Sequence, residues 1–346
     1  MITLPASSFS NAEDRARRLR REAGITMILG ALLLGVFGLT LMLGQSYTPP
    51  GEVLRVLLGE EVPGAAFTVG QLRLPRAAMS ILAGMSFGLA GVAFQIMLRN
   101  PLASPDIIGI SSGASAAAVF AIVVLSLSGT AVSVFAVMAG LGVAMTIYAL
   151  AFRDGVVGTR LILIGIGVSA MLDSFIAYVL LQAPEWTLQE ALRWLTGSVN
   201  SVRLDQAAAL AGSLFVFGGL LLSRTRELEA LRLGDDSAAA LGVNVTWTRI
   251  TVIVAAVGLI AMATAVTGPI AFVAFLAGPI AVRILGPRAS LLIPSALVGA
   301  LLVLASDYVG QFLLPSRYPV GVVTGALGAP YLIYLIVRAN RTGRSL

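Results

Sequence analysis

The chain contains no cysteine and no histidine, and all 23 of its basic residues are arginine because lysine is absent as well. Without cysteine there is neither a disulfide nor a reactive thiol. Without cysteine and histidine, the usual ligands of zinc, copper and haem are missing. The absence of lysine excludes a Walker A phosphate-binding motif and Schiff-base chemistry. We therefore expect no metal site, no cofactor and no catalytic residue in this chain.

Charge is scarce too. Only 12% of the 346 residues are charged, whereas 58% are hydrophobic, and the mean hydropathy is +0.93. A soluble domain carries about twice that share of charge. The apolar runs are too long for the strands of a membrane barrel, and in lipid every backbone polar group needs an internal partner. This composition predicts an all-α membrane protein that crosses the bilayer many times.

About ten apolar runs are candidates for transmembrane helices. They cover residues 25–43, 75–98, 106–126, 131–152, 161–182, 206–223, 249–267, 270–285, 289–313 and 320–337. The run at 270–285 is short and carries Pro279, with Pro269 just before it, so we expect a broken or tilted helix there. The organisation expected is a tail at 1–24, a helical domain at 25–337 with a long hydrophilic loop at 222–248, and a tail at 338–346. Short helices are expected at 49–59 and just before Gly197.

The arginines are distributed unevenly along this topology. With the N-terminus in the cytoplasm, the inner segments hold seventeen arginines and the outer segments hold six, the asymmetry that the positive-inside rule requires. We therefore predict a multi-pass protein of a bacterial plasma (inner) membrane with both termini in the cytoplasm. The net charge of +6 follows from this topology, and it gives no reason to expect nucleic acid as a partner.

An unusual segment, RNPLASPDIIGISSGASA, lies at residues 99–116 between two apolar runs. Pro101 and Pro105 prevent a continuous helix, and Asp106 stands near the expected start of the next one, where an anion is favoured. The small residues that follow allow close helix packing. The segment is either a passive inner hairpin or a hinge beside a passage.

Taken together, several segments resemble the FecCD-type permeases, the membrane subunits of ABC importers for ferric siderophores, haem and vitamin B12. The matching segments are residues 72–115, RLILIGIGVSAML (160–172), RWLTGSVN (193–200), LGDDSAAALGVNV (233–245), TGPIAFVAFLAGPIAVRIL (267–285) and YPVGVVTGALGAPYLIYLI (318–336). The resemblance implies the type II (vitamin B12 importer-like) permease fold and import of a ferric siderophore. It also implies three kinds of partner: a second permease (self or a paralogue), two subunits that bind ATP and magnesium, and an extracytoplasmic substrate-binding protein. Alternatives are a permease for haem or cobalamin, or an ion-coupled secondary transporter with two inverted five-helix halves and Asp173 as its coupling site.

The resemblance also implies roles for individual residues. A cytoplasmic loop docking on the ATPase would comprise Asp235, Asp236, Ser237, Ala238, Leu241 and Gly242. Docking of the binding protein would involve Arg73, Arg76 and Arg317, and the cytoplasmic gate and pathway would involve Asn100, Leu102, Gly158, Thr159 and Asp173. From the residues alone, the loop could equally be a solvated segment with a helix cap at Gly242, and Arg73 and Arg76 could be interfacial anchors.

Three positions depart from the pattern of the family. Gly278–Pro279 stands where a Pro-His pair is common, Gln311 where an arginine is common, and Tyr318 where a glutamate is common. These changes weaken any inference about the outer docking surface. They also suggest one specialised half of a heterodimer, although a homodimer stays open.

Overall fold

The computed structural model describes residues 7–105, 109–151, 158–200, 202–287 and 289–341, and in these ranges the chain forms helices and no strand. In chain order the elements, three of them π-helical (η), are α1 (Ser7–Met42), α2 (Pro50–Leu57), η1 (Ala66–Arg73), α3 (Leu74–Met97), α4 (Ile110–Val123), α5 (Thr130–Ala151), α6 (Gly158–Leu181), α7 (Glu185–Leu195), α8 (Leu204–Ser213), η3 (Leu214–Gly218), α9 (Gly219–Ser223), α10 (Thr225–Leu231), α11 (Asp235–Ala240), α12 (Val245–Thr267), α13 (Val273–Leu285), α14 (Leu292–Tyr308), η4 (Val309–Leu313) and α15 (Val320–Arg341). Seven helical segments are long and apolar enough to cross a membrane, and three shorter apolar helices join them. The prediction of an all-α membrane protein with about ten spans is confirmed.

Helix α3 forms the centre of the bundle, where it packs against α12, α13 and α14. Its glycines make this packing close. A Cβ atom added to Gly84 would collide with the backbone of Gly299, and one added to Gly91 would collide with the backbone of Ala274. Small residues let helix backbones approach closely in a membrane, so these glycines permit the close approach of α3 to α14 and α13.

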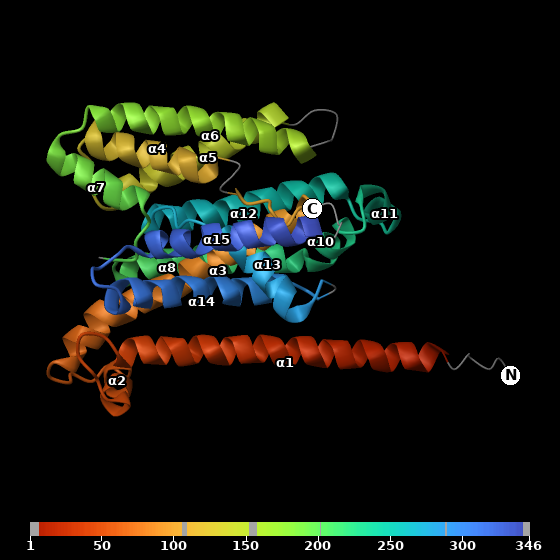
Figure 1. Cartoon of the computed structure of the whole chain (residues 1–346), viewed down its shortest axis with the longest axis horizontal. Helices are drawn as coiled ribbons and strands as arrows, with labels where there is room; N and C mark the ends of the chain where they lie inside the picture. Colours follow the sequence, from red (N-terminus) through yellow and green to blue (C-terminus); the bar gives the residue numbers. More distant parts are fainter. Residues whose placement is uncertain (1–6, 106–108, 152–157, 201, 288, 342–346) are drawn as a thin grey trace.

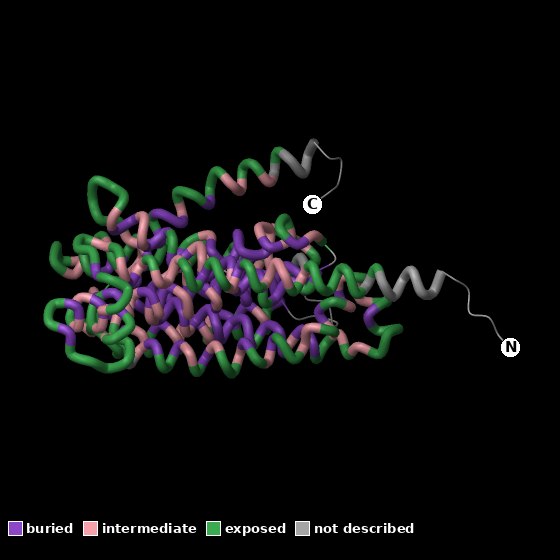
Figure 2. The backbone as a smooth tube through the Cα atoms, turned by 90° about the horizontal axis from the view of Figure 1, so that it is seen from below, coloured by how far each residue is buried: buried purple, intermediate pink, exposed green. Residues whose placement is uncertain are grey.

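The helices at the periphery are much less buried. Helices α4, α5, α6 and α7 form a group of their own on one side, whereas α1 lies along the opposite side (Figure 1). Figure 2 shows the buried backbone concentrated in the middle of the bundle. Only 11% of the apolar window in α6 is buried. The outer face of α6 therefore needs lipid or another protein against it.

The two ends of the bundle carry different short helices. The start of α1 lies at the same end as α10 and α11, and α2 and α7 lie at the other (Figure 1). The short helices expected at 49–59 and before Gly197 are confirmed as α2 and α7. Helix α1 begins at Ser7, so most of the segment expected as a tail continues the first span as helix. Its alanine, arginine and glutamate residues are good helix formers.

The eighth span is short, as expected, but the break expected in it is not found. Helix α13 runs without interruption from Val273 to Leu285 with Pro279 inside it, and the irregular segment lies before it, after the end of α12 at Thr267. Two residues in that segment, Gly268 and Phe272, have positive φ angles of 70° and 66°. The third span starts later than expected, at Ile110 after Gly109 with φ 85°, and Asp106 lies outside the described residues.

Three glycines from distant segments meet at the end of the bundle that carries α7. The Ser198 N–H donates to the Thr267 carbonyl at 2.6 Å, and the Gly321 N–H donates to the Gly197 carbonyl at 3.1 Å. A Cβ atom on Gly197, Gly268 or Gly321 would collide with neighbouring backbone. We call this set of three residues the glycine junction. It fixes the ends of α7, α12 and α15 relative to one another through backbone contact alone.

Candidate functional site

The hydrophilic loop at 222–248 folds into the two short helices α10 and α11, followed by a sharp turn. Gly242 has φ 86°. The Val243 N–H donates to the Ala238 carbonyl at 3.0 Å and the Gly242 N–H donates to the Ala239 carbonyl at 2.9 Å. These two bonds form a Schellman motif, in which a residue with positive φ ends the helix. A Cβ atom on Gly242 would meet nothing within 4 Å, so glycine is favoured there by its backbone conformation and not by lack of space.

The six predicted docking residues divide into two groups. Asp236, Ser237, Leu241 and Gly242 are exposed and form the outer face of the loop. Ala238 is fully buried in the permease core, so the prediction that it contacts an ATPase is wrong: the small residue lets α11 lie against its own bundle. Asp235 also points inward, toward arginines of the permease.

Large apolar side chains flank the same loop, and two of them, Leu233 and Trp247, were missed by sequence reasoning. Leu233, Leu241 and Trp247 are 66%, 66% and 58% exposed. The Asn244 side chain accepts the Trp247 N–H at 3.0 Å and so caps the first turn of α12. The position of Trp247, a large aromatic residue just after a hydrophilic loop, was the sequence signal that could have indicated this surface. Apolar groups gathered at a polar end of a protein indicate a contact surface.

Asp235, the first residue of α11, joins three elements. Its carboxylate accepts two hydrogen bonds from Nη2 of Arg249 at 2.8 and 3.0 Å. It also lies 3.6 Å from Nη2 of Arg99, at the end of α3. The Arg249 side chain is only 11% exposed, whereas that of Arg99 is 48% exposed. The loop is therefore tied firmly to α12 and more loosely to α3.

The turn after α3 holds two of the predicted gate residues. Arg99 adopts a positive φ of 52° and ends the helix. The Asn100 side-chain oxygen accepts the Leu102 N–H at 2.9 Å, and the backbone carbonyl of Asn100 accepts the Ala103 N–H at 3.1 Å. Asn100 thus builds the turn itself, and Leu102 is half-buried beside it.

The other predicted pathway residues lie on α6. Gly158 and Thr159 begin this helix, and the turn before it, residues 152–157, lies outside the described residues. Asp173 lies in the middle of α6 and is exposed, and Met171 and Tyr178 of the same helix are exposed too. A carboxylate at that depth needs a water-filled cavity or a protein partner. The structure therefore leaves Asp173 on an uncovered face, and its pathway role stays a prediction.

At the opposite end, Arg73 does not present its charge to a partner. The residue is 9% exposed, and its guanidinium donates to the carbonyls of Leu41, Met42 and Ser46 at 2.9, 3.0 and 2.6 Å. A further bond reaches the Thr48 hydroxyl at 3.2 Å. Arg73 holds the segment after α1 against η1, which replaces the expectation that it docks a binding protein.

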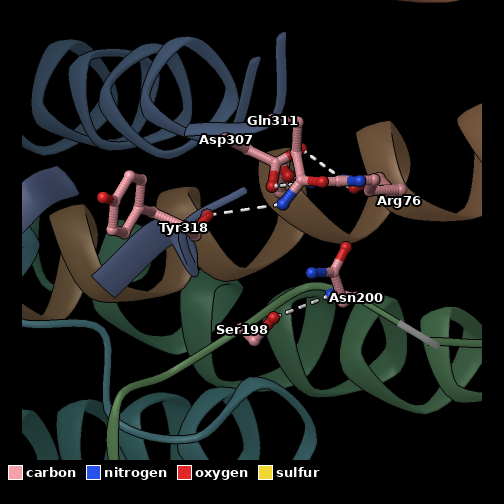
Figure 3. A network of polar contacts seen from close by, with 7 residues as sticks. Arg76, Ser198, Asn200, Asp307, Gln311 and Tyr318 are labelled. Atoms are coloured by element: carbon pink, nitrogen blue, oxygen red, sulfur yellow. Dashed lines mark hydrogen bonds and ion pairs between the residues drawn. The ribbon is translucent and has the colours of Figure 1, made fainter. Parts of the chain in front are cut away.

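Arg76 is also occupied within the chain. Its Nε and Nη2 each donate to a carboxylate oxygen of Asp307 at 2.6 Å, a bidentate pair between α3 and α14 (Figure 3). The two side chains are only 19% and 8% exposed. Paired in this way, the guanidinium joins the two helices, and a role for Arg76 in docking stays a prediction.

Arg317 is the one predicted docking arginine that the structure exposes. It lines a cavity of about 1180 Å³ at this end of the bundle, together with exposed Arg193 of α7. Arg193 was missed as a site residue, although it begins the segment RWLTGSVN. Two guanidiniums at one open rim can bind carboxylates with bidentate geometry.

Contacts in the structure accompany the three departures from the family pattern. A Cβ atom on Gly278 would collide with the side chain of buried Gln95, whose amide donates to the Phe275 carbonyl at 3.0 Å. Gln311 and Tyr318 are brought together, since the Gln311 amide donates to the Tyr318 carbonyl at 3.3 Å (Figure 3). Two neutral residues thus replace two commonly charged ones at neighbouring positions.

In the described residues, seven helices of membrane-spanning length and three shorter apolar ones form a bundle with an irregular segment after α12 and a capped two-helix loop at one end. This organisation is that of the membrane-spanning permease of an ABC transporter. Comparisons with known proteins agree. The FecCD transport family matches residues 32–338, and the chain belongs to this family of transport permeases.

Individual relatives match over nearly their whole length. The chain is 38% identical to the ferric enterobactin transport system permease protein FepG of Escherichia coli (strain K12), over 92% of this chain and 96% of the relative. It is also 38% identical to the achromobactin transport system permease protein CbrC of Dickeya dadantii (strain 3937), over 94% and 95%. Among solved structures, an inward-facing transporter described as of the metal-chelate ABC type matches with a TM-score of 0.82 and 26% identity, over 91% of this chain and 99% of that one.

Proposed function

We propose that this chain is the permease through which an ATP-driven importer moves a ferric siderophore across a bacterial plasma membrane, with both termini in the cytoplasm. The observation that carries the proposal is the loop of α10 and α11. Its exposed face combines Asp236, Leu241 and the Gly242 turn, and exposed Trp247 lies close to it in the chain. A secondary transporter has no use for such a docking element.

The loop would dock on an ATPase subunit. That subunit, and not this chain, would bind ATP and magnesium. Two permeases, identical or paralogous, would present two such loops to two ATPase subunits. The uncovered face of α6, with Asp173 in its middle, supports a second permease packed there. Such packing would place Asp173 in protein or beside a passage, and not in lipid. ATP binding and hydrolysis would then open the passage alternately to the two sides.

The nature of the substrate follows from the relatives and from what the chain lacks. The relatives named above transport ferric enterobactin and achromobactin, and others are named for iron citrate and iron hydroxamate. A chain without cysteine and histidine has few ligands with which to remove iron from a chelator. The intact chelate would therefore cross, delivered by a binding protein that docks near exposed Arg193 and Arg317.

Gly242→Val tests the proposal. A β-branched residue at φ 86° is strained by about 1–2 kcal/mol, and the strain falls on the docking turn and on no membrane span. We expect normal insertion, loss of co-purification with the ATPase and loss of ferric siderophore uptake. Gly212→Val is the matched control, because a Cβ atom there also meets nothing within 4 Å and the residue lies in the regular helix α8.

Uptake in proteoliposomes, with the ATPase and the binding protein present, should be measured for ferric siderophores, haem and cobalamin in parallel. Uptake of haem or cobalamin in place of the siderophore would refute the substrate class and keep the importer. Uptake that needs no ATPase, with Gly242→Val fully active, would refute the importer itself.

A further inference from the structure

The contacts of Asp235 point to a specific part in the transport cycle. This carboxylate is the first residue of α11, and it contacts two arginines from different helices of the bundle. One of them, Arg249, lies in the first turns of α12, and the other, Arg99, ends α3. The loop and two central helices therefore meet at a single side chain.

The two contacts differ in strength. The Arg249 contact has two short hydrogen bonds, and the arginine side chain is 11% exposed. Removing the carboxylate would leave that cation buried without its partner, which is strongly unfavourable. The Arg99 contact is 3.6 Å long between side chains that are 48% and 39% exposed. Exposed ion pairs of this kind contribute little to stability and separate at small cost.

The weaker contact links α11 to the turn after α3, because Arg99 stands directly before that turn. Arg99 immediately precedes Asn100, whose side chain and carbonyl build the turn between α3 and α4. Gly234, directly before Asp235, lies close to the same guanidinium, since a Cβ atom there would be 3.3 Å from Nη1 of Arg99. A displacement of α11 therefore acts directly on the residue that begins the turn.

We propose that Asp235 is a positioning residue that transmits movement of the docking loop through Arg99 to the turn at residues 100–103, with Arg249 as the fixed point. The inference rests on the proposed function, because it assigns a task to the loop once an ATPase is bound. The Arg249 contact keeps α11 on α12 throughout the cycle. The Arg99 contact breaks and re-forms as the loop moves, and the turn beginning at Asn100 moves with it.

The first experiment compares Arg99→Gln with Arg55→Gln in the reconstituted complex with ATPase and binding protein. Arg55 lies in α2, outside the docking loop, and it forms an exposed ion pair with Glu60 in which the two side chains are 58% and 52% exposed. For Arg99→Gln we expect full co-purification with the ATPase and a fall in uptake per ATP hydrolysed of roughly 2- to 30-fold, the range of coupling energies carried by single side chains. Arg55→Gln, which also removes one exposed ion pair, should keep the wild-type ratio.

Asp235→Asn should reproduce the loss of uptake per ATP, and Asp235→Glu should restore most of it, because it retains the charge. A wild-type ratio of uptake to hydrolysis in both Arg99→Gln and Asp235→Asn would overturn the inference. Failure of the wild-type chain to bind the ATPase would instead overturn the proposed function.

A second experiment uses the absence of cysteine from the chain. Arg99→Cys combined with Asp235→Cys allows the contact to be locked by a short, reducible bifunctional thiol reagent. The locked complex should bind the ATPase and lose uptake, and reduction should return uptake to the level of the untreated double variant. Unchanged uptake while locked would show that this contact need not open.

Discussion

Removal of the Asp307 carboxylate should destabilise the permease strongly, because it leaves Arg76 without its partner. The guanidinium makes two 2.6 Å bonds to Asp307, and the two side chains are 19% and 8% exposed. Breaking a buried pair from one side costs about 3–5 kcal/mol. Since Arg76 keeps some contact with water, we expect about 3 kcal/mol for Asp307→Ala, at the lower end of that range.

The double variant Arg76→Met with Asp307→Ala separates the cost of the orphaned charge from the value of the pair. An apolar replacement of both partners is often neutral or even stabilising, so the double variant should lie within about 1 kcal/mol of the wild type. At roughly 2 °C for each kcal/mol, Asp307→Ala should lower the apparent Tm in nanodiscs by about 6 °C. The double variant should recover most of that loss.

The same variants decide between organising the helices and docking a binding protein. If Arg76 acts only within the chain, the double variant should bind the loaded binding protein as the wild type does. A double variant as unstable as Asp307→Ala, or a stable one with weakened capture of the binding protein, would refute this reasoning.

Three further outcomes are expected. Single cysteines introduced as Ser10→Cys and Gly343→Cys should resist an impermeant thiol reagent on intact cells, and labelling of either one would place that terminus outside. Gly321→Ala should destabilise the permease because its Cβ atom would collide with the Thr196 carbonyl, whereas Gly325→Ala, with nothing within 4 Å, should be tolerated; equal Tm values for the two would contradict the glycine junction. The purified permease should bind free Fe³⁺ or Zn²⁺ only weakly, and a stoichiometric submicromolar site in calorimetry would contradict the expectation drawn from its composition.

Features that depend on local sequence could be predicted. The spans, the shortness of the eighth span and the short helices α2 and α7 all follow from apolar periodicity and from Pro and Gly positions. The cap at Gly242 belongs to the same class, since the small residues before it form a helix that glycine ends. The length of α1 was underestimated because hydropathy marks where a helix enters lipid and not where helix begins.

Pairings between distant residues could not be predicted. Arg76 and Asp307 are 231 residues apart, and nothing local distinguishes an arginine that will be paired from one that stays free at the outer end. Arg73 and Arg317 illustrate this, because both read as outer arginines, yet one is buried among carbonyls and the other is exposed. The inward direction of Asp235 likewise depends on which face α11 turns toward the bundle.

The two ends of the bundle are held by contacts of different kinds. At the end with α7, the glycine junction joins three helices through backbone contact, and the Arg76–Asp307 pair is shielded from water. Close backbone packing has few discrete alternatives and resists gradual deformation. At the end with α11, the Arg99–Asp235 contact is long and half-exposed, so it separates at small cost. A movement imposed on this protein therefore meets less resistance where α11 contacts Arg99 than at the glycine junction.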